Sequence, residues 1–139
     1  MAERVLVDTS ILIGLLNEKK WEDDFLALNQ RARILLSVVT ANKLLRGAHD
    51  PLSRKIVDGL LDIFGDRFVT PSESHWMECA RISEKLLRES RRSKENVLLL
   101  QNDLLIALGA RDAGATLVTN DKRDFGLLKP YVKVPIEFW

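Results

Sequence analysis

The segment "VLVDTSILIGLL", residues 5–16, decides the fold because two hydrophobic patterns meet there at one aspartate. "RVLVD", residues 4–8, is a short apolar run that ends at a carboxylate, which is typical of a buried strand in a parallel sheet. "SILIGLLN", residues 10–17, predicts a helix, and Thr9 or Ser10 is suited to cap its first amides. A strand followed directly by a helix indicates an α/β protein.

The rest of the chain repeats this alternation. Further strands are predicted at residues 32–37, 67–70, 115–119 and 132–135, and helices at residues 21–28, 38–48, 50–65, 72–90 and 97–114. Strands that alternate with helices predict an α/β fold of three layers, an α/β/α sandwich with a central, mostly parallel sheet. Because no repeat or linker interrupts the pattern, residues 1–139 are expected to form a single domain.

Composition excludes several classes of protein. Cys79 is the only cysteine, so a disulfide framework and a cysteine-based zinc site are excluded, and a reducing, cytoplasmic location is expected. No apolar run reaches the roughly 18 residues of a membrane span, and the first residues lack a signal-peptide pattern. We therefore expect a cytoplasmic protein without a membrane association.

Charge limits how the chain could contact nucleic acid. Lys and Arg total 21 against 20 Asp and Glu, so there is no global basic field, and any contact with RNA or DNA must be local. The one dense basic patch is "RESRRSK", residues 88–94, at the end of a predicted helix. It is interpreted first as a solvated helix terminus whose cations complement the helix dipole, with phosphate binding as the alternative.

Three aspartates are predicted to meet at one edge of the sheet. Asp8 ends the first strand and Asp121 follows the fourth, so both lie at the carboxyl edge, where ligands bind in such sheets. Each connecting helix begins at the same edge, which brings Asp103 and position 43 there as well. Asp8 and Asp121 could instead be an ordinary helix cap and a turn residue. Asp103 lies in a helix that is apolar on nearly every side, where a lone charge is costly unless it is paired or binds a cation.

An acidic cluster of this kind points to metal chemistry. Neither His49 nor His75 adjoins these segments, and hard oxygen ligands select Mg²⁺ or Mn²⁺. Two carboxylates about 5 Å apart repel by roughly 3 kcal/mol at an effective dielectric of 20, and a divalent cation removes that cost. The residues alone therefore predict metal-dependent hydrolysis of a phosphodiester or phosphate.

The chain resembles the PIN-domain ribonucleases of the VapC toxin type over essentially its whole length. Three segments carry the resemblance: the opening "VLVDTSILIGLL" (5–16), "SVVTANKLLRGA" (37–48) and "NDLLIALGARDAGATLVTNDKRDF" (102–125). The resemblance implies an α/β/α sandwich of the PIN-like kind, Mg²⁺ or Mn²⁺ in an acidic pocket, and endonucleolytic cleavage of RNA. It also implies a homodimer that a cognate antitoxin neutralises. By position, the implied roles are metal ligation and catalysis for Asp8, Asp103 and Asp121, and support of the pocket for Ser10 and Thr119. Asp124 in "RDF" either supports the pocket as well or only pairs with a neighbouring Arg.

Lys43 departs from the family pattern. The family segment "S-x-x-T-x-x-E-L-x-x-G" has an acid at this position, while Ser37, Thr40, Leu44 and Gly47 all match it. The helical wheel alone assigns Lys43 to solvated surface, but the family pattern makes it a charge reversal in a metal site. An ammonium about 5 Å from Mg²⁺ is repelled by roughly 7 kcal/mol at an effective dielectric of 20, so metal binding and catalysis should weaken.

Two other functions stay open at the level of sequence. A non-catalytic PIN-like module that binds antitoxin or RNA would leave the pocket without metal and RNA uncleaved. A phosphatase of the haloacid dehalogenase type also has an aspartate at the end of its first strand, but it needs a second Asp where this chain has Ser10. Lys43 itself fits either a natural, degenerate member of the family or a variant altered so that a toxic nuclease could be produced.

Overall fold

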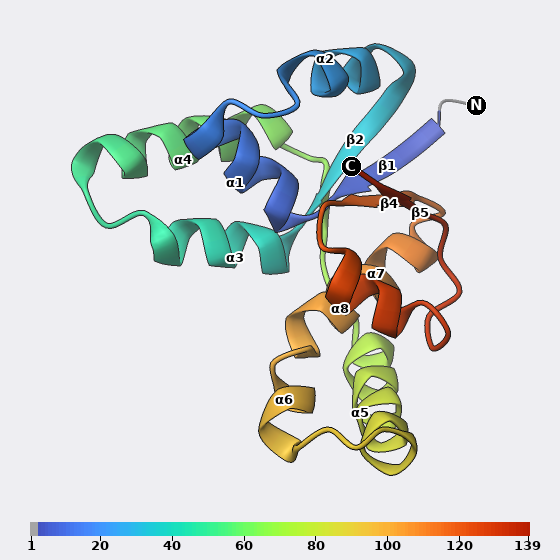
Figure 1. The fold of residues 1–139 in the computed structure, drawn as a ribbon. Coiled ribbons are helices and arrows are strands. Elements are labelled where there is room, and N and C mark those ends of the chain that lie inside the picture. Colours follow the sequence, from blue (N-terminus) through green and yellow to red (C-terminus); the bar gives the residue numbers. More distant parts are fainter. Residues whose placement is uncertain (1–2) are drawn as a thin grey trace.

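The computed structural model describes residues 3–139. Its strands are β1 (Glu3–Val7), β2 (Ala32–Ser37), β3 (Phe68–Val69), β4 (Thr116–Thr119) and β5 (Ile136–Phe138). Its helices are α1 (Thr9–Glu18), α2 (Glu22–Arg31), α3 (Val38–Gly47), α4 (Pro51–Phe64), α5 (Glu73–Glu89), α6 (Lys94–Leu98), α7 (Gln101–Asp112) and α8 (Lys122–Leu128). Figure 1 shows how they are arranged.

The strands form one sheet in the order β3-β2-β1-β4-β5, and every neighbouring pair is parallel. The chain therefore builds outward from β1 in one direction through β2 and β3, and later in the other direction through β4 and β5. The boundary between β1 and β4 is the point where the strand order reverses, and open α/β sheets leave a crevice beyond the strand ends at such a point.

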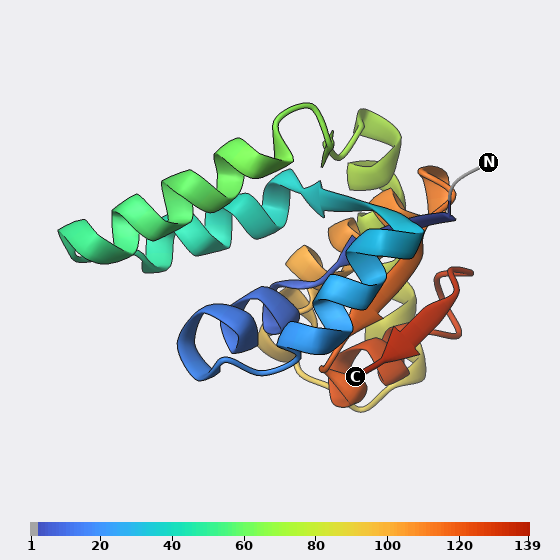
Figure 2. The same ribbon diagram turned by 90° about the horizontal axis from the view of Figure 1, so that it is seen from above.

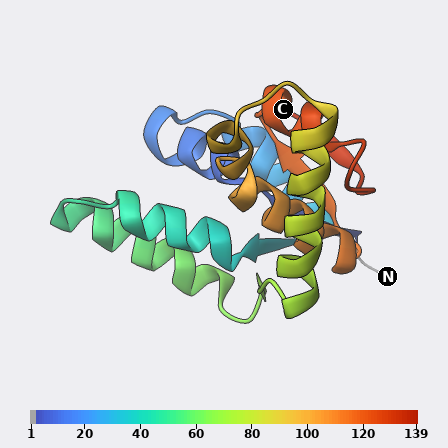
Figure 3. The same cartoon turned by 90° about the horizontal axis from the view of Figure 1, so that it is seen from below.

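Helices cover both faces of the sheet. Leu6, Leu35 and Leu117 contribute to a core with residues of α5, α7 and α8, and Figure 3 shows α5 lying across this side. The alternate strand positions, such as Val5, Ile34 and Val118, contribute to a second core with residues of α1 to α4. Both sets are buried, which explains why the strands are continuous apolar runs. The predicted three-layer α/β/α sandwich is confirmed.

Residues at the strand ends also begin the helices. Asp8 follows β1 and caps α1, with its side chain accepting from the Ser10 amide, and Ser37 ends β2 and caps α3 in the same way. As a result, α1 and α3 both start at the carboxyl edge. From there α3 and α4 run side by side and antiparallel, extending away from the sheet (Figure 2).

The structure corrects two predicted elements and adds a third that the sequence analysis does not predict. The last strand is Ile136–Phe138 instead of residues 132–135, because Pro135 has no amide to donate and the Val134 amide bonds to the Val132 carbonyl. The helix predicted at residues 97–114 is divided into α6 and α7, with a tight turn in which the Leu100 amide bonds to the Val97 carbonyl. Helix α8 was not predicted at all.

Within residues 3–139, every helix is too short or too polar to cross a bilayer.

Gly14 permits a close approach that shapes the turn after α1. A Cβ atom at Gly14 would overlap the indole ring of Trp21. Trp21 itself has a positive φ of 61°. Gly59 also lies inside a helix, α4, but a Cβ atom there would meet nothing within 4 Å. Gly59 therefore serves as the control position for a substitution at Gly14.

We expect Gly14→Ala to lower the free energy of unfolding by about 1–3 kcal/mol, as is usual for overpacking. Gly59→Ala should raise it by up to about 1 kcal/mol, because alanine is the better helix former. Urea denaturation of both variants measures the difference. Equal stabilisation by the two substitutions would show that the Trp21 ring does not restrict this position.

Candidate acidic site at the carboxyl edge of the sheet

The site begins where β1 and β4 end side by side. The Asp8 amide donates to the Val118 carbonyl at 2.8 Å, so the pairing of the two strands continues to the edge of the sheet. This places Asp8 next to Thr119, the last residue of β4. Both residues are buried, with 4% of Asp8 and none of Thr119 exposed. The strand order thus puts a carboxylate at the crevice between β1 and β4.

Two hydroxyl groups hold Asp8 by one of its oxygens. Oδ2 accepts from Ser10 Oγ at 2.9 Å and from Thr119 Oγ1 at 2.9 Å. Oδ1 is buried and has no hydrogen-bond partner within the described part of the chain. Burying a carboxylate oxygen without a hydrogen-bond partner costs free energy, so this atom is suited to bind a cation.

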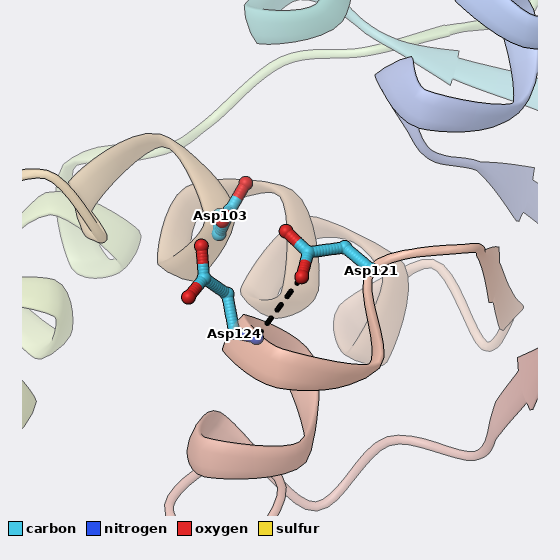
Figure 4. Close-up of side chains that lie close together, drawn as sticks. All are labelled: Asp103, Asp121 and Asp124. Carbon is cyan, nitrogen blue, oxygen red and sulfur yellow. Dashed lines mark hydrogen bonds between the residues drawn. The ribbon is translucent and has the colours of Figure 1, made fainter.

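Three further carboxylates gather where α7 and α8 begin, as Figure 4 shows. Asp103 comes from the first turn of α7, Asp121 caps α8, and Asp124 lies in the first turn of α8. One oxygen from each carboxyl group lies within 4.8 Å of the others. Asp121 is held on both sides, because its amide donates to Thr119 Oγ1 at 3.0 Å and its Oδ1 accepts from the Asp124 amide at 3.0 Å.

The burial of Asp103 and the neighbouring charges act together on its protonation. Burial, followed by the charge of Asp8, raises the pKa of Asp103 to about 7, and the ammonium of Lys43 opposes this rise. Asp8 lies outside the group of three carboxylates, and its charge is the second cause of the raised pKa of Asp103. Burial and the charge of Asp121 also raise the pKa of Asp124. The pocket therefore holds more negative charge than its surroundings can stabilise.

Lys43 supplies a cation to this pocket. Its Nζ lies 3.7 Å from Asp103 Oδ1, and 35% of its side chain is exposed against 11% for Asp103. The helical wheel predicts solvated surface for Lys43 because it considers α3 alone, but α3 packs against α7, which carries Asp103. The contact is long and partly exposed, so it compensates the acidic charge only in part.

The sequence-predicted site residues divide into two sets. Asp103 and Asp121 are brought together, and Asp124, expected only to support the pocket, joins them directly. Asp8 stands apart with Ser10 and Thr119, which bind its Oδ2. Sequence reasoning missed Asp124 as a full member because it did not predict α8. The spacing D-x-x-D at residues 121–124, which is typical of a helix start, is the signal that could have found it.

The donor set fits a hard divalent cation. Every candidate ligand is a carboxylate oxygen, and one of them, Asp8 Oδ1, has no partner within the described residues. Oxygen ligands of this kind favour Mg²⁺ or Mn²⁺ over softer metals. Lys43 is the feature of the pocket that acts against such an ion.

Comparisons with known proteins give one family and a set of similar folds. Residues 5–128 match the sequence profile of the family described as PIN domain. No curated protein sequence gives a significant match. Among solved structures, several VapBC structures are similar in fold.

A chain of VapBC2 from Rickettsia felis, crystallised with a DNA fragment from their promoter, has a TM-score of 0.72 and 23% identity, with 98% of both chains covered. A chain of VapBC-1 from nontypeable Haemophilus influenzae has a TM-score of 0.71 and 20% identity, also with 98% of both chains covered. A chain of VapBC-5 from Mycobacterium tuberculosis, a toxin-antitoxin system, has a TM-score of 0.64 and 24% identity at the same coverage.

We expect Asp103→Asn to raise the melting temperature in metal-free buffer at pH 8. The pKa of Asp103 is 3.8 ordinarily and about 7 in the folded chain, so ionisation of this carboxyl opposes folding increasingly as the pH rises between these values. The difference between the two pKa values corresponds to about 4 kcal/mol, which is an upper limit for the gain in the free energy of unfolding. The stabilisation should therefore be full at pH 8 and absent below about pH 4.

Thermal unfolding in EDTA at a series of pH values measures this effect. Asp58→Asn, on an exposed position of α4, is the control and should change the melting temperature little at any pH. If Asp103→Asn instead lowers the melting temperature at pH 8, the ion pair with Lys43 stabilises the fold more than the crowding of acids destabilises it.

Proposed function

The chain belongs to the PIN domain family, as the match over residues 5–128 shows, and we propose that it is a metal-dependent endoribonuclease of the VapC toxin type whose activity Lys43 weakens. The predicted family is thereby confirmed. The observation that carries the proposal is the gathering of Asp103, Asp121 and Asp124 at the edge where Asp8 follows β1 and the strand order reverses. PIN domains are generally nucleases, and this set of acids suits that chemistry.

Four carboxylates are available to a metal ion. Asp103, Asp121 and Asp124 would hold it, and Asp8 would contribute through its unpartnered Oδ1. Bound Mg²⁺ or Mn²⁺ would polarise the scissile phosphate and lower the pKa of an attacking water. The proposed ligand set includes the three aspartates expected from sequence and adds Asp124.

The residues of the chain position these groups. Ser10 and Thr119 each donate to Asp8 Oδ2, which fixes the carboxylate with its other oxygen available. Thr119 also accepts from the Asp121 amide, so one hydroxyl couples the ends of β1 and α8. Asp124 is positioned by the start of α8, since its amide donates to Asp121 Oδ1 at 3.0 Å.

Lys43 weakens the pocket in two ways. Its ammonium already interacts with Asp103, so a metal ion must displace it or tolerate its repulsion. It also stands where the family has an acid, so one ligand or water-orienting group is lost. The same contact favours a second function, a non-catalytic PIN-like module that keeps its binding partners but does not cleave RNA.

We propose RNA as the substrate, a cognate antitoxin as the partner, a homodimer as the assembly and the cytoplasm as the location. The names of the similar structures support an antitoxin, since they are VapBC complexes. This chain also has a groove of about 170 Å³ between α1, α3 and α4, lined by the apolar Ile13, Leu16, Leu44 and Val57 and by polar residues that include Asn17, Lys43 and Ser53. A groove with both apolar and polar walls suits an amphipathic segment of such a partner.

We predict that Lys43→Glu creates or restores RNA cleavage that depends on Mg²⁺ or Mn²⁺. The substitution removes a positive charge from the pocket and adds an acid, and together these should raise the rate by at least about tenfold. Cleavage of purified RNA with Mn²⁺ present or chelated measures it. Induction in cells without antitoxin gives a second readout, in which the Lys43→Glu variant should stop growth and the unaltered chain should be tolerated.

Lys55→Glu makes the same charge change on an exposed position of α4 and should leave cleavage unchanged. Asp103→Asn in the Lys43→Glu background should abolish the new activity. Equal cleavage by the unaltered chain and the Lys43→Glu variant would show that position 43 is not part of the site. No cleavage by either protein would favour the binding module.

A further inference from the structure

Lys43 belongs to two sites at once. Its Nζ lies 3.7 Å from Asp103 Oδ1, on the side of the acidic pocket. The same side chain also lines the groove of about 170 Å³ between α1, α3 and α4. The ammonium of Lys43 is therefore within reach of a molecule that occupies this groove.

The ammonium of Lys43 has unused hydrogen-bonding capacity. At 3.7 Å, the contact with Asp103 is longer than a hydrogen bond. Among residues 3–139, no second carboxylate lies within 4.0 Å of Lys43 Nζ. A lysine ammonium has three donors, and 35% of this side chain is exposed. A carboxylate that enters the groove would thus find a cation that the described residues compensate only in part.

The apolar walls of the groove favour a protein segment over a nucleic acid. Leu44 and Val57 are buried in the fold, but Ile13 and Leu16 keep 42% and 37% of their surface exposed. Covering such surface with apolar side chains is favourable, and an amphipathic helix docks in this way. A phosphate backbone would bury none of it. The groove therefore fits an amphipathic helix of a partner protein.

Helix α3 sets the order of residues along one wall of the groove. It begins at the carboxyl edge of the sheet and extends away from it (Figure 2), so Lys43 lies nearer that edge than Gly47 and Ala48. A Cβ atom at Gly47 would meet nothing within 4 Å, so the groove is open beside this residue. Lys43 therefore marks the end of this wall that is nearer to the acidic pocket.

We propose that the groove binds an amphipathic helix of a partner protein, and that Lys43 selects a partner with Asp or Glu at the position that meets its ammonium. The inference rests on the proposed function, which supplies the protein partner, and adds the chemistry by which this chain recognises it. A partner with Lys or Arg at that position would bring like charges together at a half-buried site, which costs affinity. Lys43 is thus a determinant of partner specificity.

A phage-display library of helical peptides of about 16 residues is the probe, used with the full-length chain in EDTA. Leu, Ile or Val is placed with i, i+3, i+4 and i+7 spacing, and the other positions are equal mixtures of Glu, Lys, Gln and Ala. Peptides that still bind Gly47→Leu are removed, because a side chain at Gly47 extends into the open groove. The remaining peptides should carry Glu over Lys at one position by at least about tenfold, and selection on Lys43→Glu should reverse this preference.

Fluorescence anisotropy of the most enriched peptide measures the contribution of the ammonium. Lys43→Met should weaken binding at least about tenfold, as expected for the loss of a hydrogen bond between charged groups. Lys55→Met, at an exposed position of α4, is the matched control and should weaken binding less than about twofold. Gly59→Leu controls for Gly47→Leu, since a Cβ atom there also meets nothing within 4 Å, and it should retain binding. Circular dichroism should show that all the variants are folded.

Enrichment of Lys, or of neither charge, at every position would overturn the proposal. Equal weakening by Lys43→Met and Lys55→Met would do so too, as would a library without any peptide whose binding Gly47→Leu abolishes. Self-association of the unaltered chain that Gly47→Leu abolishes, measured by sedimentation equilibrium, would assign the groove to a second copy instead. Cleavage by the Lys43→Glu protein needs no peptide, and peptide binding in EDTA needs no metal, so failure of this inference and failure of the proposed function are distinguishable.

Discussion

Repulsion among four carboxylates at one edge of the sheet is the constraint on which the other features of this site depend. Asp8 reaches the edge because β1 ends there, Asp121 because β4 ends beside β1, and Asp103 and Asp124 because α7 and α8 begin there. Among Asp103, Asp121 and Asp124, which approach within 4.8 Å of one another, each pair of ionised groups costs roughly 3 kcal/mol at an effective dielectric of 20. The parallel sheet therefore folds only with some compensation for these acids.

The compensation in this chain comes from protons, hydroxyl groups and one ammonium. Asp103 has its pKa raised to about 7, Asp8 is held by Ser10 and Thr119, and Lys43 lies near Asp103. A divalent cation would compensate all the acids at once, and Lys43 supplies a single charge from one side. Lys43 thus relieves the repulsion in the pocket without metal and opposes the binding of a divalent cation there.

The fold can be predicted from the sequence because its strands and its helix caps are both determined by neighbouring residues in the chain. Apolar runs that end at polar residues predict buried strands, and helix caps such as Asp8 and Ser37 follow from residue type. Topology alone predicts that Asp8, Asp103 and Asp121 lie at one edge of the sheet. The division between α6 and α7 could not be predicted, because residues 97–100 contain no glycine or proline to mark the turn. The orientation of Lys43 could not be predicted either, since it depends on how α3 packs against α7.

Anomalous diffraction from crystals soaked in Mn²⁺ tests the account most directly, because it locates the ion independently of activity. The account predicts a peak bounded by the carboxylates of Asp8, Asp103, Asp121 and Asp124, with higher occupancy in crystals of a Lys43→Glu protein than in the unaltered chain. A peak elsewhere, or no peak at this edge of the sheet in either protein at saturating Mn²⁺, would contradict it.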